Sequence, residues 1–217
     1  MKIIENAAGI ILRTRLLTET SLVVHWLTPN FGRIATVARG ARRPKSPFLG
    51  KLDLFYEADF SFSRGRKTDL HVLREVNLRE THAEFRADIL KLRRAAYAVA
   101  FIEQATETET PLPNIFELLQ TFLRRLCEQK PLGPIVLSME LKLLHELGLE
   151  PDWAGTSLAA GTKKIAAILS RQSFAAGENL KLTKAQIEEL RQFLHGFLIF
   201  YLGRLPKGRA AALASVV

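Results

Sequence analysis

Residues 9–38, GIILRTRLLTETSLVVHWLTPNFGRIATVA, contain three short runs in which apolar and polar residues alternate or β-branched and aromatic residues gather. The runs are residues 9–17, 21–28 and 33–38. The sequence PNFG at residues 29–32 separates the second run from the third and is typical of a turn. Alternation of period two with a turn signal is the pattern of β-strands, so the stretch predicts an antiparallel meander of three strands.

Two further strands are expected downstream, at residues 51–63 and at residues 69–78. Within the first of these, apolar residues recur at every second position from Ala58 to Phe62. No helical spacing interrupts the five runs. Five strands within the first 80 residues indicate a small closed barrel instead of an open sheet.

The spacing of apolar residues becomes helical from Thr81 onward. The last helix, capped by Thr183, is apolar almost all the way round and is expected to lie buried among the others. The expected helices cover residues 84–107, 114–126, 135–147, 162–172 and 183–205. The predicted fold class is therefore α+β multi-domain, with an N-terminal small β-barrel over residues 1–80 and an all-α helical domain over residues 81–217.

The chain has 31 Lys and Arg residues against 22 Asp and Glu residues, a formal net charge of +9. Residues 1–80 hold 14 basic and 8 acidic residues, whereas residues 81–217 hold 17 and 14. This excess indicates an anionic partner, either a nucleic acid or an acidic protein segment. The shorter part is the more basic one, which favours a binding role for the expected barrel.

The positive charge is concentrated in the loop after the third expected strand. Residues 31–50, FGRIATVARGARRPKSPFLG, include five basic residues and no acidic residue. Loops of small five-stranded barrels bind oligonucleotides, and several cations along one groove neutralise phosphates. A solvated loop that only aids solubility is the alternative, although such a loop normally mixes charges. The candidate phosphate contacts here and in a second basic loop are Arg33, Arg39, Arg42, Arg43, Lys45, Lys51, Arg64, Arg66 and Lys67.

Aromatic residues that stack on bases usually accompany a cationic groove. Alternation along the strand favours a core position for Phe60 and Phe62. Phe31 and Phe48 lie in turn or loop sequence, so these two are the candidates for exposed stacking surfaces. The full set of aromatic residues considered is Trp26, Phe31, Phe48, Phe55, Tyr56, Phe60 and Phe62.

The sequence has no pattern typical of a catalytic or metal site. It contains no HExxH, GxSxG, P-loop or GxGxxG motif, and Cys127 is its single cysteine, which excludes an intrachain disulfide and a multi-cysteine zinc site. Asp53, Glu57 and Asp59 are close together, but they alternate with apolar residues, which favours an exposed strand face over a hydrolytic pair. We therefore expect no enzyme activity, cofactor or metal, and a reducing cytosol as the compartment. The longest apolar run, about ten residues, is too short to span a bilayer.

The expected helical domain offers a second contact for an anionic partner. An apolar groove rimmed by Lys142, Arg191, Arg204 or Lys207 would accept an acidic peptide tail. Ordinary core packing beside surface cations is the competing interpretation.

The stretch GIILRTRLLTETSLVVHWLTPNFGRIATVARGARRPKSPFLGKLDLF, residues 9–55, resembles the N-terminus of the RecO family of bacterial DNA-repair proteins. The resemblance rests on Gly9–Arg15, Glu19–Ser21, Gly32-Arg33 and Ala38–Ser46. The segments FELLQTFLRRL, MELKLLHELGLEPDW and FLHGFLIFYLGRLPKGRA resemble the family's helices more loosely and in the same order. Many members carry a four-cysteine zinc module after the stretch that matches Leu147–Trp153, but residues 152–182 contain no cysteine, so no metal is expected here.

The resemblance implies an OB-fold followed by a helical domain, acting as a recombination mediator without catalysis. Family members bind single- and double-stranded DNA, anneal complementary strands, bind the acidic C-terminal tail of the single-stranded-DNA-binding protein, and with RecR help to load RecA. On this basis residues 39–51 form the phosphate track, helped by Arg13, Arg15 and residues 64–67. The expected location is the cytoplasm, with the nucleoid. Two alternatives stay open: an OB-fold module that binds RNA, and a metal-dependent nuclease.

Overall fold

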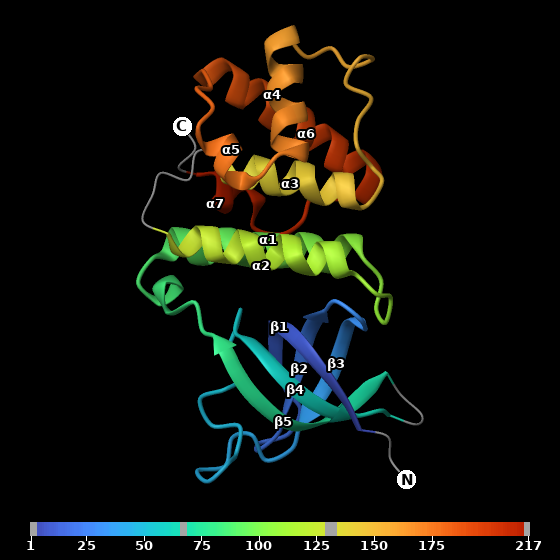
Figure 1. Ribbon diagram of the computed structural model, residues 1–217, viewed down its shortest axis with the longest axis vertical. Helices are drawn as coiled ribbons and strands as arrows, with labels where there is room; N and C mark the ends of the chain where they lie inside the picture. The colour runs from blue at the N-terminus through green and yellow to red at the C-terminus, as the bar shows by residue number, and fades with distance from the viewer. Residues whose placement is uncertain (1–3, 66–68, 129–133, 215–217) are drawn as a thin grey trace. The chain divides into compact units, whose positions relative to one another are not determined.

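The computed structural model describes residues 4–65, 69–128 and 134–214. Its N-terminal part is a closed barrel of five strands, drawn in blue to green in Figure 1. The strands are β1 (Ile4–Leu16), β2 (Leu22–Thr28), β3 (Gly32–Ala38), β4 (Glu57–Ser63) and β5 (Leu70–Glu80). They pair in the order β1-β2-β3-β5-β4, with β3 and β5 parallel and the other pairs antiparallel. The predicted meander and the predicted OB-like barrel are confirmed.

The barrel closes because β1 is long enough to pair with two neighbours. Its C-terminal half pairs with β2, up to Leu16 opposite Leu22, and its N-terminal half pairs with β4, from Ile4 opposite Ser63. The register shifts between Ile11 and Arg13. A bulge of this kind bends a strand and increases its twist, which lets one strand serve both sides of a small barrel.

The barrel interior is filled by aromatic and β-branched side chains. Trp26 is fully buried, stacks on Phe60 with ring centroids 4.0 Å apart, and donates its indole N–H to Thr36 Oγ1 at 2.9 Å. This bond satisfies the one polar atom that the ring would otherwise leave unpaired in the core. Phe60 and Phe62 are core residues, as their alternation along the strand predicts.

The fourth strand is shorter than predicted, because residues 51–56 form turns. The Asp53 carboxylate accepts the N–H of Leu54 at 2.8 Å, and the Asp53 carbonyl accepts the N–H of Tyr56 at 3.3 Å. Side-chain bonds from Asp to nearby backbone compete with strand pairing. The fourth strand therefore begins only at Glu57.

The chain forms two compact units. The barrel unit comprises Met1–Ala83 and Glu107–Gln120, and the helical unit comprises Glu84–Thr106 and Thr121–Val217. Divided in this way, the barrel unit holds 14 basic and 11 acidic residues, net +3, and the helical unit holds 17 and 11, net +6. The predicted domain boundary near residue 80 stays a prediction, and the structure adds residues 107–120 to the barrel.

Residues 107–120 are tied to the barrel by backbone and side-chain bonds. Glu109 donates its N–H to the carbonyl of Arg33 at 3.0 Å, and Leu112 donates to the carbonyl of Pro29 at 3.1 Å. Gln120 Nε2 donates to Glu57 Oε1 at 2.6 Å. These contacts join a connecting segment to the β2–β3 turn and to β4 within the barrel unit.

The remaining described residues are mainly helical (Figure 1). Asp88 caps α1, and Thr183 caps α6 in a capping box with Gln186, as the sequence predicts for Thr183. None of the helices in the described ranges is both long and apolar enough to cross a membrane. The helices are η1 (Ala83–Arg86), α1 (Ile89–Ala105), α2 (Pro113–Cys127), α3 (Ile135–Glu146), α4 (Ala160–Arg171), α5 (Phe174–Glu178), α6 (Lys184–Leu202) and α7 (Arg209–Leu213).

A buried polar cluster joins α1, α3 and α7 inside the helical unit. Arg209 Nε and Nη2 donate to the two carboxylate oxygens of Glu140 at 2.7 and 2.9 Å. The Tyr97 hydroxyl donates to the same carboxylate. Glu140 is 0% exposed and Arg209 is 5% exposed. Water does not stabilise either charge, so each is stabilised by the other.

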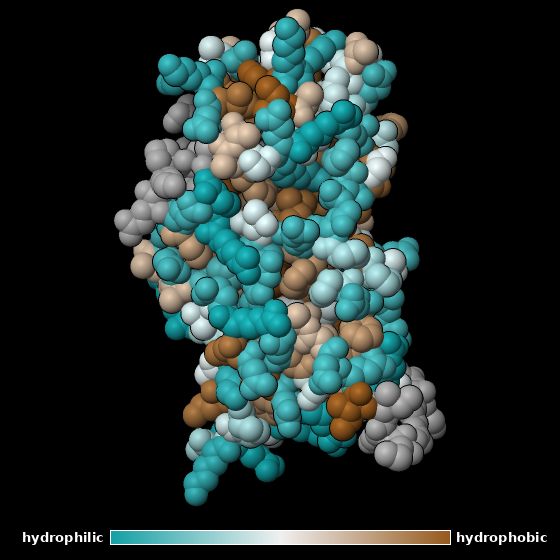
Figure 2. Space-filling model, in the orientation of Figure 1, coloured by the Kyte–Doolittle hydropathy of each residue, from teal (hydrophilic) through white to brown (hydrophobic). Residues whose placement is uncertain are grey.

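The expectation that the last helix is buried on all sides is wrong. Helix α6 buries Leu190, Leu194 and Leu198, while Phe200 is 80% exposed and Tyr201 is 47% exposed. The buried residues recur every fourth position and form one stripe, so a single face of α6 packs on the rest of the unit. The face of the molecule in Figure 2 is mostly hydrophilic, with apolar residues interrupting it on both units.

Candidate nucleic-acid interface

The basic loop after β3 is an ordered series of turns. Its amides bond to carbonyls three residues back, as in Arg43 to Gly40 at 3.0 Å, Ser46 to Arg43 at 3.0 Å and Lys51 to Phe48 at 3.0 Å. Ala41 and Phe48 are each 6% exposed and belong to the barrel core. The loop is therefore anchored by apolar side chains at two points.

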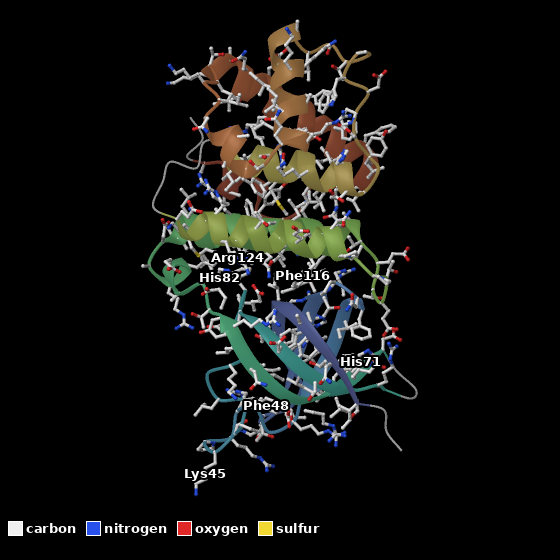
Figure 3. All side chains as sticks on the ribbon, in the orientation of Figure 1. Lys45, Phe48, His71, His82, Phe116 and Arg124 are labelled. Atoms are coloured by element: carbon white, nitrogen blue, oxygen red, sulfur yellow. The ribbon has the colours of Figure 1, made fainter. Side chains whose placement is uncertain are left out.

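The loop cations, Arg39, Arg42, Arg43 and Lys45, are all exposed. Figure 3 shows Lys45 pointing away from the barrel while Phe48 lies against it. None of the four forms an ion pair with a carboxylate in the described parts of the chain. Four cations on an anchored loop form a surface that can bind consecutive phosphates.

Bonds from the loop to the β1–β2 hairpin hold it beside that hairpin. Arg42 donates its N–H to the carbonyl of Thr20 at 3.0 Å and its Nη1 to the carbonyl of Glu19 at 2.9 Å. The hairpin presents Leu16, 67% exposed, and Leu17, 48% exposed. Neither leucine is among the residues predicted from the sequence to bind a partner.

Lys51, also a predicted phosphate contact, is half-buried and donates Nζ to the carbonyl of Val76 at 3.1 Å. This bond attaches the end of the loop to β5. The structure thus gives the Lys51 side chain, like that of Arg42, a bond to a backbone carbonyl within the barrel unit.

Three further predicted residues lie together on the outer face of the sheet formed by β1, β2 and β3. Arg13 is the cross-strand partner of His25, Arg15 is the partner of Val23, and Arg33 pairs with Leu27 on the other side of β2. The neighbours Val24 and Trp26 point into the core, so alternation places His25 on the outer face. Arg13, Arg15 and Arg33, the sheet-face cations, therefore surround one histidine.

His25 is expected to stay neutral far below the usual range of a histidine. Burial lowers its pKa most, and the charges of Arg13, Arg15 and Arg33 lower it further, from 6.5 to about 4. Between these values the unfolded chain binds a proton that the folded chain does not, so acidification lowers the free energy of unfolding. An NMR titration of the His25 ring should show a midpoint near pH 4, and Arg13→Ala should raise it. A wild-type midpoint near 6.5 would contradict this assignment.

The second basic loop, between β4 and β5, is only partly described. Arg64 pairs with Glu5, with Nε 2.7 Å from Oε1, and its guanidinium carbon lies 5.6 Å from the centroid of the Phe31 ring. Its charge is therefore balanced inside the barrel unit. Arg66 and Lys67 lie outside the described residues. The buried His71, labelled in Figure 3, accepts the N–H of Gly65 on Nδ1 at 3.3 Å and so holds the start of this loop.

The expectation that Phe48 is exposed is wrong, since it is 6% exposed. Turn sequence does not exclude burial, because a loop can insert one apolar side chain to anchor itself. Phe31 is half-buried and packs edge-on against Phe62, with ring centroids 5.4 Å apart. Of the other aromatic candidates, Trp26, Phe55, Tyr56, Phe60 and Phe62 are all buried. In the described barrel residues, Phe31 is thus the one candidate with an accessible ring.

The three carboxylates considered for hydrolysis do not face one common point. Glu57 is 2% exposed and accepts a bond from Gln120. Asp59 accepts from Arg79 Nε at 2.6 Å, and Asp53 bonds within its own turn. The described residues include no group of three or more His, Cys, Asp or Glu side chains that could hold a metal ion.

A pocket of about 460 Å³ lies between α6 and α7 in the helical unit. Arg191 and His195 line one side, and Leu205, Ala210 and Leu213 line the other. Glu188 also lines the pocket, and its carboxylate lies 3.6 Å from Arg191 Nη1, so the pocket combines an ion pair with apolar side chains. Lys142, one of the predicted rim residues, lies elsewhere: it is 9% exposed and donates to the carbonyls of Ser170 and Gln172.

Comparison with known proteins agrees with the resemblance in sequence. Residues 1–82 match the family model described as Recombination protein O N terminal, and residues 86–155 match Recombination protein O C terminal. A DNA repair protein RecO of Listeria monocytogenes is 32% identical over 147 residues, 68% of this chain and 57% of the relative. One from Exiguobacterium sibiricum is 28% identical over 162 residues, 74% of this chain and 64% of the relative.

A third relative, the DNA repair protein RecO of Bacillus cytotoxicus, is 28% identical over 207 residues, 93% of this chain and 82% of the relative. The matches to the first two relatives span less than two thirds of those proteins' own length. The two family models follow one another in this chain, the first on the barrel and the second on the residues that begin the helices. The chain therefore belongs to the RecO family of DNA repair proteins.

Proposed function

We propose that this protein is a non-catalytic recombination mediator that binds DNA and anneals complementary strands in DNA repair. The observation that carries the proposal is the group of four exposed loop cations on an anchored loop of an OB-like barrel. Annealing on such a surface requires charge neutralisation, because two polyanions brought together on cations can then pair by their own bases.

The wider role follows the family resemblance. The protein helps to load RecA on single-stranded DNA coated by its binding protein, acts with RecR, and binds both single- and double-stranded DNA in the cytoplasm at the nucleoid. The acidic C-terminal tail of the single-stranded-DNA-binding protein binds in the pocket between α6 and α7. Arg191 beside the apolar side chains of Leu205, Ala210 and Leu213 supports this placement.

Strand annealing tests the proposal. Two complementary labelled oligonucleotides coated with the single-stranded-DNA-binding protein should anneal rapidly with the wild-type protein, as followed by energy transfer across a salt series. Arg42→Ala/Arg43→Ala/Lys45→Ala should slow annealing strongly and reduce the salt slope of single-stranded DNA binding by about 2, since each lost phosphate contact removes roughly 0.7. Coating the strands with a binding protein that lacks its acidic tail tests the tail contact in the same assay.

The matched control removes three exposed cations from the helical unit, Lys164→Ala/Lys181→Ala/Lys184→Ala. This variant has the same net charge as the loop variant, so it should anneal almost as fast as the wild type if the loop binds the DNA. Equal loss in both variants would show that only net charge matters. Preferential competition by RNA would favour the RNA-binding alternative, and cleavage with magnesium or manganese would favour the nuclease.

A further inference from the structure

A row of aromatic rings lies along α6 in the helical unit. Phe193 and Phe197 have centroids 5.7 Å apart, Phe197 and Tyr201 are 4.5 Å apart, and Phe200 is 5.0 Å from Tyr201. Trp153, from the loop before α4, extends the row at 5.9 Å from Phe193. We call these five residues the aromatic ridge.

The ridge is open to solvent at the C-terminal end of α6. Phe200 is 80% exposed and Tyr201 is 47% exposed, while Leu194 and Leu198 fill the buried stripe of the same helix. Adjacent large apolar side chains that are exposed together are a feature of binding surfaces. Phe200 and Tyr201 contribute little to the core, so core packing does not explain why two aromatic residues lie here.

The other end of the ridge is held in place by hydrogen bonds. Trp153 Nε1 donates to Glu150 at 3.2 Å, and the same carboxylate accepts from His145 at 2.9 Å and from Arg171 at 3.2 Å. Burial would raise the pKa of Glu150, but the bonds from Arg171, His145 and Trp153 outweigh it and lower the pKa to about 2. The carboxylate is therefore charged at neutral pH, and Trp153 has one fixed partner.

Cations lie at both ends of the ridge. Lys163 Nζ donates to the carbonyl of Ala154, the residue after Trp153, at 3.1 Å. Arg204 is exposed two residues after the end of α6, and its carbonyl accepts from Gln104 at 2.7 Å. Neither cation pairs with a carboxylate among the described residues. The helical unit as a whole has a net charge of +6 from 17 basic and 11 acidic residues, so a polyanion is the partner that its charge complements.

The form of the surface favours nucleic acid over a partner helix. A helix binds in an apolar groove, but the pocket along α6 lies on its other flank, at Arg191 and His195. Exposed aromatic rings between cations are what proteins use to bind single strands, because every base has a face that stacks.

We propose that the aromatic ridge is a second contact for single-stranded nucleic acid, in which bases stack on Phe200 and Tyr201 and Lys163 and Arg204 bind the flanking phosphates. This inference rests on the proposed function of the barrel and extends it to the helical unit. The barrel binds mainly through charge, since its aromatic side chains are largely buried, and the ridge supplies the stacking that the barrel lacks.

The test is the binding of fluorescein-labelled oligothymidylate to the full chain, measured by anisotropy at fixed salt. Phe200→Ala/Tyr201→Ala should weaken binding about tenfold with an unchanged salt slope, because it removes rings and no charge. Ile199→Ala is the matched control: Ile199 is 41% exposed on the same helix but lies outside the ridge, and its variant should bind like the wild type. A labelled backbone of abasic sites should bind the wild type and the double variant equally.

Tryptophan fluorescence gives a second measurement. Trp26 is 0% exposed inside the barrel and Trp153 is half-buried in the ridge, so quenching by oligothymidylate should come from Trp153 and disappear in Trp153→Phe. Unchanged affinity of the double variant, or quenching by an acidic peptide but not by the oligonucleotide, would overturn the inference. If the wild type binds no nucleic acid, the proposed function itself fails. If binding depends on the loop cations and not on the ridge, only this inference fails.

Discussion

Replacing Gly32 with alanine is expected to lower the free energy of unfolding of the barrel unit by about 3 kcal/mol. Gly32 has a φ of 62°, and a Cβ there would lie 1.8 Å from the carbonyl oxygen of Thr110. The backbone would have to move, because no flexible side chain can yield. The bonds from Glu109 to Arg33 and from Leu112 to Pro29 lie on either side of this contact and would break with it.

Hydrogen exchange measures this effect directly. The amides of Glu109 and Leu112 should lose protection in Gly32→Ala while the amides of β4 keep most of theirs. Gly50→Ala is the control, because Gly50 has a φ of 72° but no atom within 4 Å of the added Cβ, so it reports the backbone strain alone. Equal loss of stability in both variants would show that the close approach of residues 107–112 does not matter.

Arg209→Met should lower the free energy of unfolding of the helical unit by about 3–5 kcal/mol. The substitution keeps much of the side-chain volume but leaves the Glu140 carboxylate, 0% exposed, without its cation. Burial and the neighbouring carboxylate raise the pKa of Tyr97, so its hydroxyl stays a donor, but one neutral donor does not replace a guanidinium. Urea unfolding followed by circular dichroism measures the loss.

A second variant distinguishes the loss of the Arg209–Glu140 ion pair from the cost of leaving the Glu140 carboxylate buried without a cation. Tyr97→Phe/Glu140→Leu/Arg209→Met removes every polar member of the cluster and should recover most of the stability, because apolar replacements of buried ion pairs are often neutral. If the triple variant is as unstable as Arg209→Met, the cost comes from lost packing and the charge is not the cause.

Much of the barrel could be predicted from the sequence because strand alternation is a local property. The runs at residues 9–17, 21–28 and 33–38 correspond to β1, β2 and β3, although β1 begins at Ile4, five residues before the predicted run, and these added residues pair with β4. The strand expected from residue 51 began at Glu57, because the Asp53 turn competes locally with pairing. The burial of one face of α6 was not predicted, since an apolar sequence does not show which side has a neighbour.

The candidate site was predicted in part, because its loop is also a local feature of the sequence. The loop cations could be recognised because they lie close together in the sequence and have no acidic residue among them. Lys51 and Arg64 looked alike in the sequence, but their partners, Val76 and Glu5, are 25 and 59 residues away. Composition cannot show whether a cation already has such a partner.

The sequence by itself determined the family, the five strands, the excess of positive charge and the loop that carries most of it, because each of these depends on residues close together in the chain. Only the tertiary structure decided that residues 107–120 pack on the barrel, that Glu140 meets Arg209, and that Trp153 continues the rings of α6. These contacts join residues far apart in the sequence: Gly32 lies beside Thr110, 78 positions away, and the bridge of Arg33 with Thr108 spans 75 positions. Close packing selects such partners from the whole chain, and local pattern does not encode them.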